Sequence, residues 1–397
     1  MPRAIRFDRN EWAGSFGDIG TDLPLVFGMV LAAGLDAASV FAVFGLLQVA
    51  TGLVYRLPMP LQPLKAMAVL VITGGVAAET LYGAGIAIGA VMLVLTLTGV
   101  LGWVARRIPL CVVRGIQLGL GLSLASLALR SYVSAQGVQG YLLAGVAFAA
   151  LVVLWGNRRI PAGLVVVGLG LVYALSFRVD LGALVAGAGF ALPRLRVPEL
   201  ADVATGFLVL ALPQLPLSLS NSVIATERTL ADLFPERRVG VRKIGFTYAA
   251  VNLLAPLAGG VPACHGCGGL AGHYALGART GGSVVIYGGF FLCAGIFLSG
   301  SLAQVVEVFP LPILGVVLLA EALILMRFVG DQAGSRRELS IALLVGVLAL
   351  ALPQGYLVGL VVGLLLYHLP VPFGAAASQP ERRELAAAES ADDAVTE

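Results

Sequence analysis

Long apolar stretches separated by short polar loops run through most of this chain and restrict it to a membrane-embedded fold. Of its 397 residues, 59% are hydrophobic and only 12% are charged, whereas soluble domains contain about 25% charged residues. Because a transmembrane helix needs about 20 apolar residues, the sequence predicts an all-α polytopic membrane protein with roughly fourteen segments. They are expected near residues 16–36, 38–55, 64–78, 83–104, 110–130, 140–155, 161–177, 200–222, 243–258, 265–276, 281–301, 309–328, 338–352 and 354–370.

Positive charge is distributed unequally between the two sides of this expected topology. With a cytoplasmic N-terminus, the loops on the inner side carry most of the arginines, including the pairs at 106–107, 237–238 and 336–337. The outer loops then receive only Arg130, Arg178, Arg194 and Arg196. Since cytoplasmic loops carry the excess of Lys and Arg, we expect an integral protein of a prokaryotic inner membrane with both termini in the cytoplasm.

An even total that divides into seven plus seven predicts two repeats of opposite orientation, a plan found in many secondary transporters. Internal similarity supports the division, because Pro24 and Pro216, and likewise Pro60 and Pro262, stand about half a chain apart. The expected organisation is a cytoplasmic N-terminus (1–13), a first repeat (14–177), a linker (178–199), a second repeat (200–370) and a disordered cytoplasmic tail (371–397).

The third and tenth segments are short, and each follows an unusual proline-containing stretch. These stretches read LPMPLQPLKAM from residue 57 and GGVPACHGCGGLAG from residue 259. Proline favours extended backbone before a helix start, so both segments are predicted to be half-helices that begin within the membrane. Their free amides and positive dipole ends would form an anion site. The glycines at 266, 268 and 269 would allow a ligand to approach the backbone closely.

Several polar side chains on or near these segments are candidates for the same site. Lys65 is either a counter-charge for a bound anion or a lysine that extends to the membrane interface. Asp18 and Asp22 are either helix N-caps or groups that couple transport to a proton or cation. Gln62 and Gln214 are expected to line a cavity, although such amides also hydrogen-bond neighbouring helices.

Other functions fit the residues less well. Cys264, His265, Cys267 and His273 supply enough atoms for zinc, but the adjacent Cys264 and His265 would point in different directions on a helix, so we expect no metal. A redox pair needs an exposed, electropositive thiol. Cys264 and Cys267 fit better as small packing residues. We find no nucleophile–base set, cofactor motif or nucleic-acid motif, so the chain is not expected to be an enzyme, to need a cofactor or to bind nucleic acid.

Four stretches resemble a known family. GSFGDIGTDLPLVFGM, LPMPLQPLKAMA, LPQLPLSLSNSVIAT and GGVPACHGCGGLAGHYALGARTGGS are similar to segments of the MOT1-type molybdate transporters, within the wider sulfate permease (SulP) superfamily. The resemblance covers residues 14–370. It implies fourteen segments in two inverted repeats, a core and a gate domain, an oxyanion held between the two half-helices, and a plausible homodimer. Many sulfate permeases add a STAS domain, for which the tail after residue 370 is too short, and Cys267 stands where a smaller residue is expected.

Carried over by position, the motif residues are Asp18, Thr21, Asp22, Gln62, Lys65, Gln214, Asn221, His265 and Gly266. We therefore expect substrate binding by Thr21, Gln62, Lys65, Gln214, Asn221, Cys264, His265, Gly266 and Gly268, and cation coupling by Asp18 and Asp22, with His265 as a further proton carrier.

The energetics favour coupled transport over passive uptake. A dianion entering a cell held at −100 mV faces about 4.6 kcal/mol of electrical work, so import is expected to be a proton symport with alternating access between core and gate. The alternatives are a sulfate or general oxyanion permease, an uncoupled anion channel, or a membrane scaffold. A scaffold has no use for a buried lysine or for paired broken helices.

Overall fold

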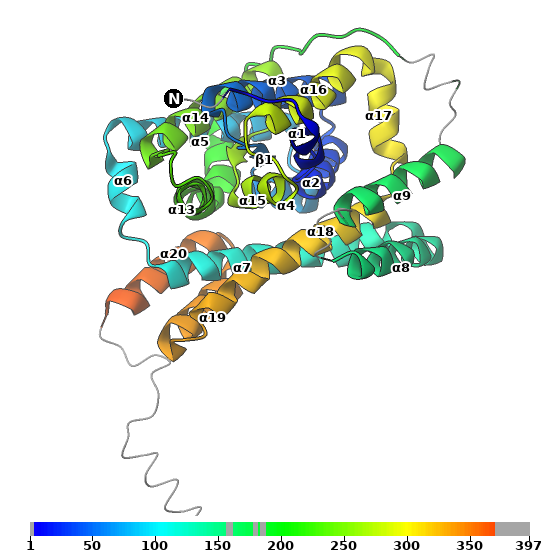
Figure 1. The fold of residues 1–397 in the computed structure, drawn as a ribbon. Helices are drawn as coiled ribbons and strands as arrows, with labels where there is room; N and C mark the ends of the chain where they lie inside the picture. Colours follow the sequence, from blue (N-terminus) through cyan, green and yellow to red (C-terminus); the bar gives the residue numbers. More distant parts are fainter. Residues whose placement is uncertain (1–3, 156–161, 178–181, 183–187, 370–397) are drawn as a thin grey trace, which may run out of the picture.

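The computed structural model describes residues 4–155, 162–177, 182 and 188–369, and most of them lie in helices. The predicted tail 371–397 and Arg178 are outside the described residues. The helices form two groups, which are separated most clearly in Figure 1. We call them the core group and the gate group, and each combines helices from both halves of the chain.

The core group contains the early helices and those of the middle of the chain. They are α2 (Ile19–Ala33), α3 (Ala37–Tyr55), α4 (Lys65–Gly74), α5 (Ala78–Leu97), α11 (Leu200–Gly206), α14 (Val241–Leu254), α15 (Cys267–Ala275) and α16 (Gly282–Phe297). Within it, α3 packs along α16, and α5 packs against both α11 and α14. The short helices α6 (Val100–Ala105) and α17 (Ser299–Val308) adjoin this group.

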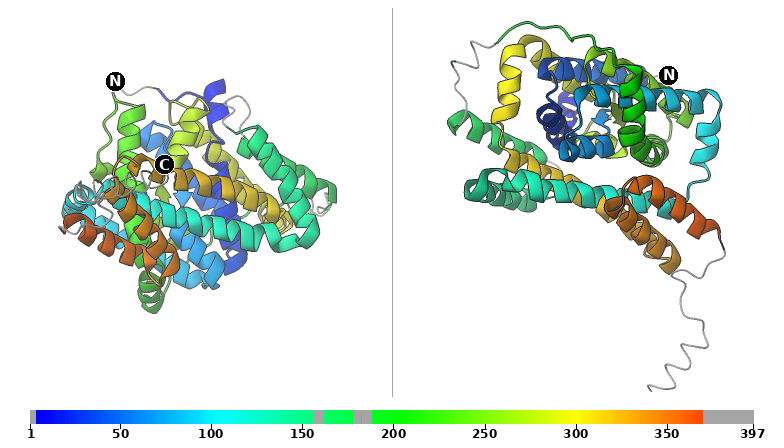
Figure 2. Two further views of the ribbon diagram at one scale, coloured as in Figure 1. Left: turned by 90° about the horizontal axis from the view of Figure 1, so that it is seen from below. Right: turned by 180° about the vertical axis from the view of Figure 1, so that it is seen from behind.

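The gate group lies across one side of the core group, as Figure 2 shows from below and from behind. It consists of α7 (Leu110–Leu127), α8 (Gly137–Val153), α9 (Ala162–Phe177), α18 (Leu311–Arg327), α19 (Arg336–Ala351) and α20 (Gly355–His368). α7 packs against α18 and α19, and α20 packs against α19. The two groups meet where α2 contacts α18 and where α4 contacts α7.

A continuous helical stretch from Leu200 to Leu233 is interrupted by two π-helical segments. After α11, the π-helix η3 (Phe207–Ala211) leads into α12 (Leu212–Leu217), which is followed by the π-helix η4 (Ser218–Ala225) and then by α13 (Thr226–Leu233). α12 contains Pro213 and Pro216, whose missing amide hydrogens interrupt the regular ladder. π-Helical turns occur frequently at functional sites.

Two three-residue strands join the proline-containing stretches to each other. β1 (Leu61–Pro63) pairs antiparallel with β2 (Ala263–His265), with Gln62 opposite Cys264. A short helix begins just after each strand, because α4 starts at Lys65 and α15 at Cys267. Extended backbone followed by a short helix was predicted at both places. The direct pairing of the two strands satisfies backbone groups that lipid could not.

Helices α3 and α16 approach so closely that their backbones touch. A Cβ atom on Gly288 would lie 2.6 Å from the carbonyl oxygen of Gly45. The neighbouring Gly289 faces open space, with nothing within 4 Å of such an atom. Small residues at one face therefore permit this packing, as they do between transmembrane helices.

The N-terminal helix α1 (Arg9–Gly14) is attached to the core group by one buried carboxylate. Glu11 is 2% exposed. Its Oε1 accepts hydrogen bonds from the backbone amides of Arg279 (3.0 Å) and Thr280 (2.8 Å), and its Oε2 accepts from that of Ser283 (3.0 Å). Glu11 thus neutralises the positive end of α16, which begins at Gly282.

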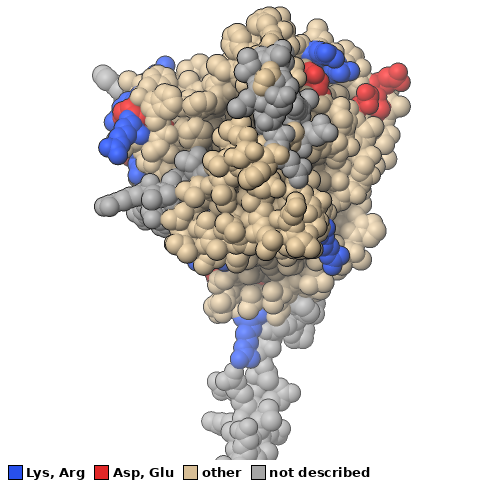
Figure 3. All heavy atoms as spheres, turned by 90° about the vertical axis from the view of Figure 1, so that its right-hand side faces the viewer, with Lys and Arg blue, Asp and Glu red and all other residues tan. Residues whose placement is uncertain are grey.

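Five helical stretches within the described residues are long and apolar enough to cross a membrane. They are Ala37–Tyr55, Ala78–Leu97, Leu110–Val153, Leu200–Leu233 and Leu311–Gln332. Shorter apolar helices include Ile19–Ala33, Lys65–Gly74, Gly282–Phe297 and Gly355–His368. The face on the right-hand side of Figure 1, seen frontally in Figure 3, is almost entirely uncharged away from its edges, as expected of a surface in lipid. The count of fourteen segments in inverted repeats stays a prediction.

Candidate functional site

Two amide side chains on the Leu200–Leu233 stretch lie seven residues apart, and each contacts the start of one short helix. Gln214 Oε1 accepts hydrogen bonds from the backbone amides of Ala66 (2.9 Å) and Met67 (3.2 Å) in the first turn of α4. Asn221 Oδ1 accepts one from the Cys267 thiol (3.2 Å) at the first residue of α15. The same helical stretch therefore serves both helix starts that the sequence predicts as an anion site.

Gln214 is held in place by a short buried chain of hydroxyl groups. Its Nε2 donates to Ser218 Oγ (3.1 Å), which lies 2.7 Å from the hydroxyl oxygen of Tyr248 on α14. Gln214 is 1% exposed, and Ser218 and Tyr248 are fully buried. Since two amides of α4 are already bonded to Gln214, α4 has fewer free donors for a ligand than its position alone suggests.

The start of α15 has no side-chain cap and is built on glycine. The Gln62 amide lies against Gly266, and the Asp18 carboxylate lies against Gly269, each in the space that a Cβ atom would occupy. Glycine is required at both positions because any larger residue would displace these polar groups. Gly268, in the same turn, is half-buried.

Asp18 and Gln62 are joined directly. Gln62 Nε2 donates a 2.6 Å hydrogen bond to Asp18 Oδ1, and both residues are buried. Asp18 occupies the N-cap position of α2, but its side chain makes no capping hydrogen bond. Asp22 lies inside α2, where its Oδ2 accepts a 2.9 Å hydrogen bond from the Tyr287 hydroxyl. Asp18 is therefore the N-cap residue by position, although its side chain makes no capping hydrogen bond, whereas Asp22 is not an N-cap.

Lys65 is the first residue of α4 and is only 3% exposed. The alternative that its ammonium group extends to the membrane interface does not fit this burial. Lys65 and Asp18 both lie within electrostatic range of the Cys264 thiol. A buried cation and a buried carboxylate therefore share the region between the two short helices.

The structure does not place the His265 ring in this cluster. His265 Nε2 lies 2.9 Å from Thr247 Oγ1, and the ring packs edge-on against Tyr55 at 5.2 Å. Side chains alternate across a strand, so Cys264 points to the face of Gln62 whereas His265 points to the opposite face. Substrate binding and proton transfer by His265 stay predictions. Cys264 and His265 point to opposite faces of the strand pair.

Thr21 lies in the first turn of α2 and is 3% exposed. Asp18, Gln62, Gln214 and Asn221 lie beside the helix starts, and their roles in binding and coupling stay predictions. The sequence analysis missed three partners of these residues. Tyr248 and Tyr287 gave no signal because they lie in ordinary apolar helices. Gln117 on α7 donates from Nε2 to Asn221 Oδ1 (3.2 Å), and these two residues are 104 positions apart in the sequence.

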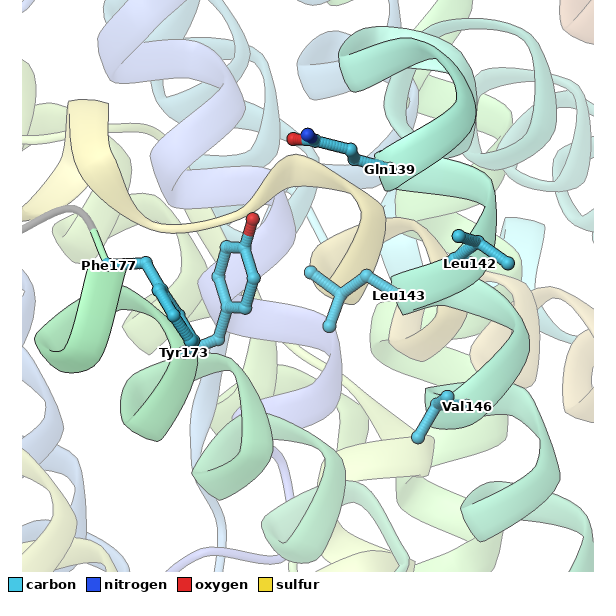
Figure 4. A pocket seen from close by; sticks show the side chains of 6 residues that line it. All are labelled: Gln139, Leu142, Leu143, Val146, Tyr173 and Phe177. Atoms are coloured by element: carbon cyan, nitrogen blue, oxygen red, sulfur yellow. The ribbon is translucent and has the colours of Figure 1, made fainter.

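A crevice of about 240 Å³ lies at the boundary between the two helix groups, beside the first turn of α4. Ala66 and Val69 of α4 and Val209 of η3 line its core side; Ser123 of α7 and Gln354 line its gate side. A larger crevice of about 540 Å³ lies elsewhere, between α8 and α9. There Leu143 and Tyr173 point toward one another, in an apolar lining that does not include the cluster (Figure 4).

The chain is similar to known molybdate transporters. The family model described as "Molybdate transporter of MFS superfamily" matches residues 10–124 and 206–325. "Molybdate transporter 1" of Arabidopsis thaliana is 33% identical over 354 residues, which cover 78% of this chain and 77% of that protein.

Solved structures share the fold at low identity. The transmembrane domain of the cyanobacterial bicarbonate transporter BicA has a TM-score of 0.64 at 18% identity and covers 91% of this chain and 98% of that one. Murine Slc26a9, an anion transporter in the inward-facing state, has a TM-score of 0.68 at 12% identity, and the match covers 92% of this chain and 68% of that one. The chain therefore belongs to the molybdate transporter family, whose members are transporters and not enzymes, and it has the fold of BicA and Slc26a9.

Proposed function

We propose that this protein is a secondary active transporter that imports molybdate across a prokaryotic inner membrane. One observation carries the proposal: two short helices of a molybdate transporter family member begin side by side inside the molecule, joined by β1 and β2. Both helix starts are buried and carry partial positive charge. A tetrahedral dianion is the ligand that such an arrangement favours.

The proposed topology has fourteen segments in two inverted repeats, with both termini in the cytoplasm. Segments one to four and eight to eleven form the core group, and the remaining six form the gate group. The antiparallel pairing of β1 with β2 supports this plan, because equivalent strands of two repeats related by a two-fold axis would meet in this way. Alternating access is then movement of the core group against the gate group, in a protein that the superfamily resemblance suggests is a homodimer.

The oxyanion is proposed to bind at the start of α15, where the backbone is bare. Asn221, Thr21 and the amides after Gly266 supply neutral donors, and Lys65 supplies the opposite charge. Gln214 acts by holding α4, and Cys264 and Gln62 line the same face of the strand pair. His265 supports the strands from behind through Thr247.

Proton coupling is proposed to run through Asp18. Its carboxylate lies against Gly269, next to the place assigned to the oxyanion. Two negative groups at such a place repel each other, and protonation of Asp18 removes the repulsion. Each proton that enters with molybdate also offsets part of the electrical work that opposes a dianion.

Sulfate import is the second candidate, because sulfate is also a tetrahedral dianion and a small size difference is worth only about 1–3 kcal/mol in a pocket. The deciding experiment is calorimetric titration of the purified protein with molybdate in excess sulfate. Binding that survives sulfate and weakens in Lys65→Ala is the expected result. Equal competition by sulfate would reassign the substrate, and absence of oxyanion binding would overturn the proposal.

A further inference from the structure

A chain of four side chains connects the surface of the gate group to the first residue of α15. Arg114 Nη1 donates to Gln117 Oε1 (3.0 Å), and Gln117 Nε2 donates to Asn221 Oδ1 (3.2 Å), which also accepts the Cys267 thiol. Gln117 is fully buried and Asn221 is 3% exposed. Gln117 is on α7 of the gate group, whereas Asn221 is on η4, which packs against α14, α15 and β2 of the core group. Their contact therefore crosses the boundary between the two groups.

The outer end of this chain is fixed by a fork of hydrogen bonds. Arg114 Nε and Nη2 both contact Asp331 Oδ2, at 2.7 Å and 2.5 Å, and the guanidinium carbon lies 5.0 Å from the centre of the Phe328 ring. Arginine can hold two partners with one rigid group, which lysine cannot do. Arg114 is therefore immobilised, and its remaining Nη1 points to Gln117.

The direction of every hydrogen bond in the chain follows from the guanidinium group, which is only a donor. Gln117 must turn its oxygen toward Arg114 and its amide hydrogens toward Asn221. Asn221 must in turn present its oxygen to Gln117 and Cys267, so its Nδ2 hydrogens point away from both. Within the part of the chain that the structure describes, Asn221 Nδ2 donates to no protein acceptor.

We propose that Gln117 is a positioning residue for the oxyanion: it holds the Asn221 amide with its donors toward the substrate, and Arg114 fixes Gln117 in that orientation. The inference rests on the proposed function. Because Gln117 belongs to the gate group and Asn221 to the core group, the donor is held only while the two groups are in contact. Substrate affinity thereby depends on the position of the gate.

The test is uptake of molybdate into proteoliposomes by Gln117→Glu, in the wild-type and Asn221→Ala backgrounds. A carboxylate offers no hydrogen to Asn221 Oδ1, so the Asn221 amide turns its donors toward residue 117 and away from the substrate. We expect KM to rise about tenfold with little change in Vmax. In the Asn221→Ala background the same substitution should have no further effect on KM.

Gln117→Met, which keeps the length of the side chain without polar atoms, is the second variant if Gln117→Glu does not fold. Arg114→Lys should raise KM in the same direction. The matched control is Gln139→Glu, an exposed glutamine on α8 of the gate group, which should leave KM unchanged.

Two outcomes would overturn the positioning role and leave molybdate transport in place. One is an equal rise in KM for Gln117→Glu in both backgrounds, and the other is a fall in Vmax and thermal stability at constant KM. A wild-type protein that takes up no oxyanion would instead overturn the proposed function, and with it this inference.

Discussion

Two carboxylates on α2 lie about one helical turn apart and have different partners. Asp18 accepts from Gln62 and lies against α15, whereas Asp22 accepts from Tyr287. Asp18→Asn keeps an oxygen that accepts the hydrogen bond from Gln62, but its amide cannot take up and release a proton during transport. One coupled proton is worth about 1.4 kcal/mol per pH unit, or tenfold in accumulation. We expect Asp18→Asn to abolish this tenfold dependence on the pH gradient and to retain molybdate binding.

The measurement is the molybdate accumulation ratio in proteoliposomes at imposed pH gradients. Asp22→Asn is the matched control, since it changes an equally buried carboxylate of the same helix, which accepts a hydrogen bond from Tyr287 on α16. It should keep the response to the gradient. Loss of the response in Asp22→Asn alone would assign coupling to the other carboxylate.

At the residue scale, sequence reasoning succeeds where one backbone feature decides the outcome. Proline and glycine located both helix starts because each restricts or frees the local backbone. His265 illustrates what local sequence does not reveal. In a strand of three residues, the face on which a side chain lies depends on the register of pairing, and His265 pairs with Leu61, which is 204 positions away in the sequence. The Gln117–Asn221 contact, 104 positions apart, is equally invisible to local pattern.

At the scale of elements, the packing of α3 on α16 depends on which side of α16 carries the small residues. Gly288→Leu would drive a side chain into the backbone of α3 at Gly45 and should cost about 3 kcal/mol or more. The adjacent Gly289→Leu enters open space and should be tolerated. Thermal unfolding in detergent should show a Tm lower by several degrees for Gly288→Leu only. Equal shifts for both variants would contradict the close packing.

The attachment of α1 to α16 through Glu11 makes a second prediction at this scale. Glu11→Ala removes three hydrogen bonds to a charged acceptor, each worth about 1.5–3 kcal/mol, and leaves the start of α16 without its counter-charge. We expect faster protease cleavage between α1 and α2 together with a lower Tm. Glu79→Ala, at an exposed acidic residue in the first turn of α5, is the control and should behave as the wild type.

For the whole molecule, the proposed alternating access requires the boundary between the core and gate groups to open and close during each transport cycle. Ser123 on α7 and Val209 on η3 line the crevice from opposite sides. Cysteines at both positions, joined by a short bifunctional thiol reagent in a Cys293→Ser background, should reduce uptake to background and preserve molybdate binding. Each single cysteine is the control. Undiminished uptake after cross-linking would contradict movement at this boundary.

The pairing of β1 with β2 also determines when the protein is completed during synthesis. The backbone of β1 finds its partner only after residue 263 has left the ribosome, about 200 residues later. At roughly 5–20 residues per second, this delay is on the order of 10–40 s. Throughout it, α4 and its extended leader lack the strand that satisfies them in lipid. The proposed substrate site therefore cannot form until about two thirds of the chain has been made, and a nascent chain that stops before β2 exposes β1 to the insertion machinery and to proteases.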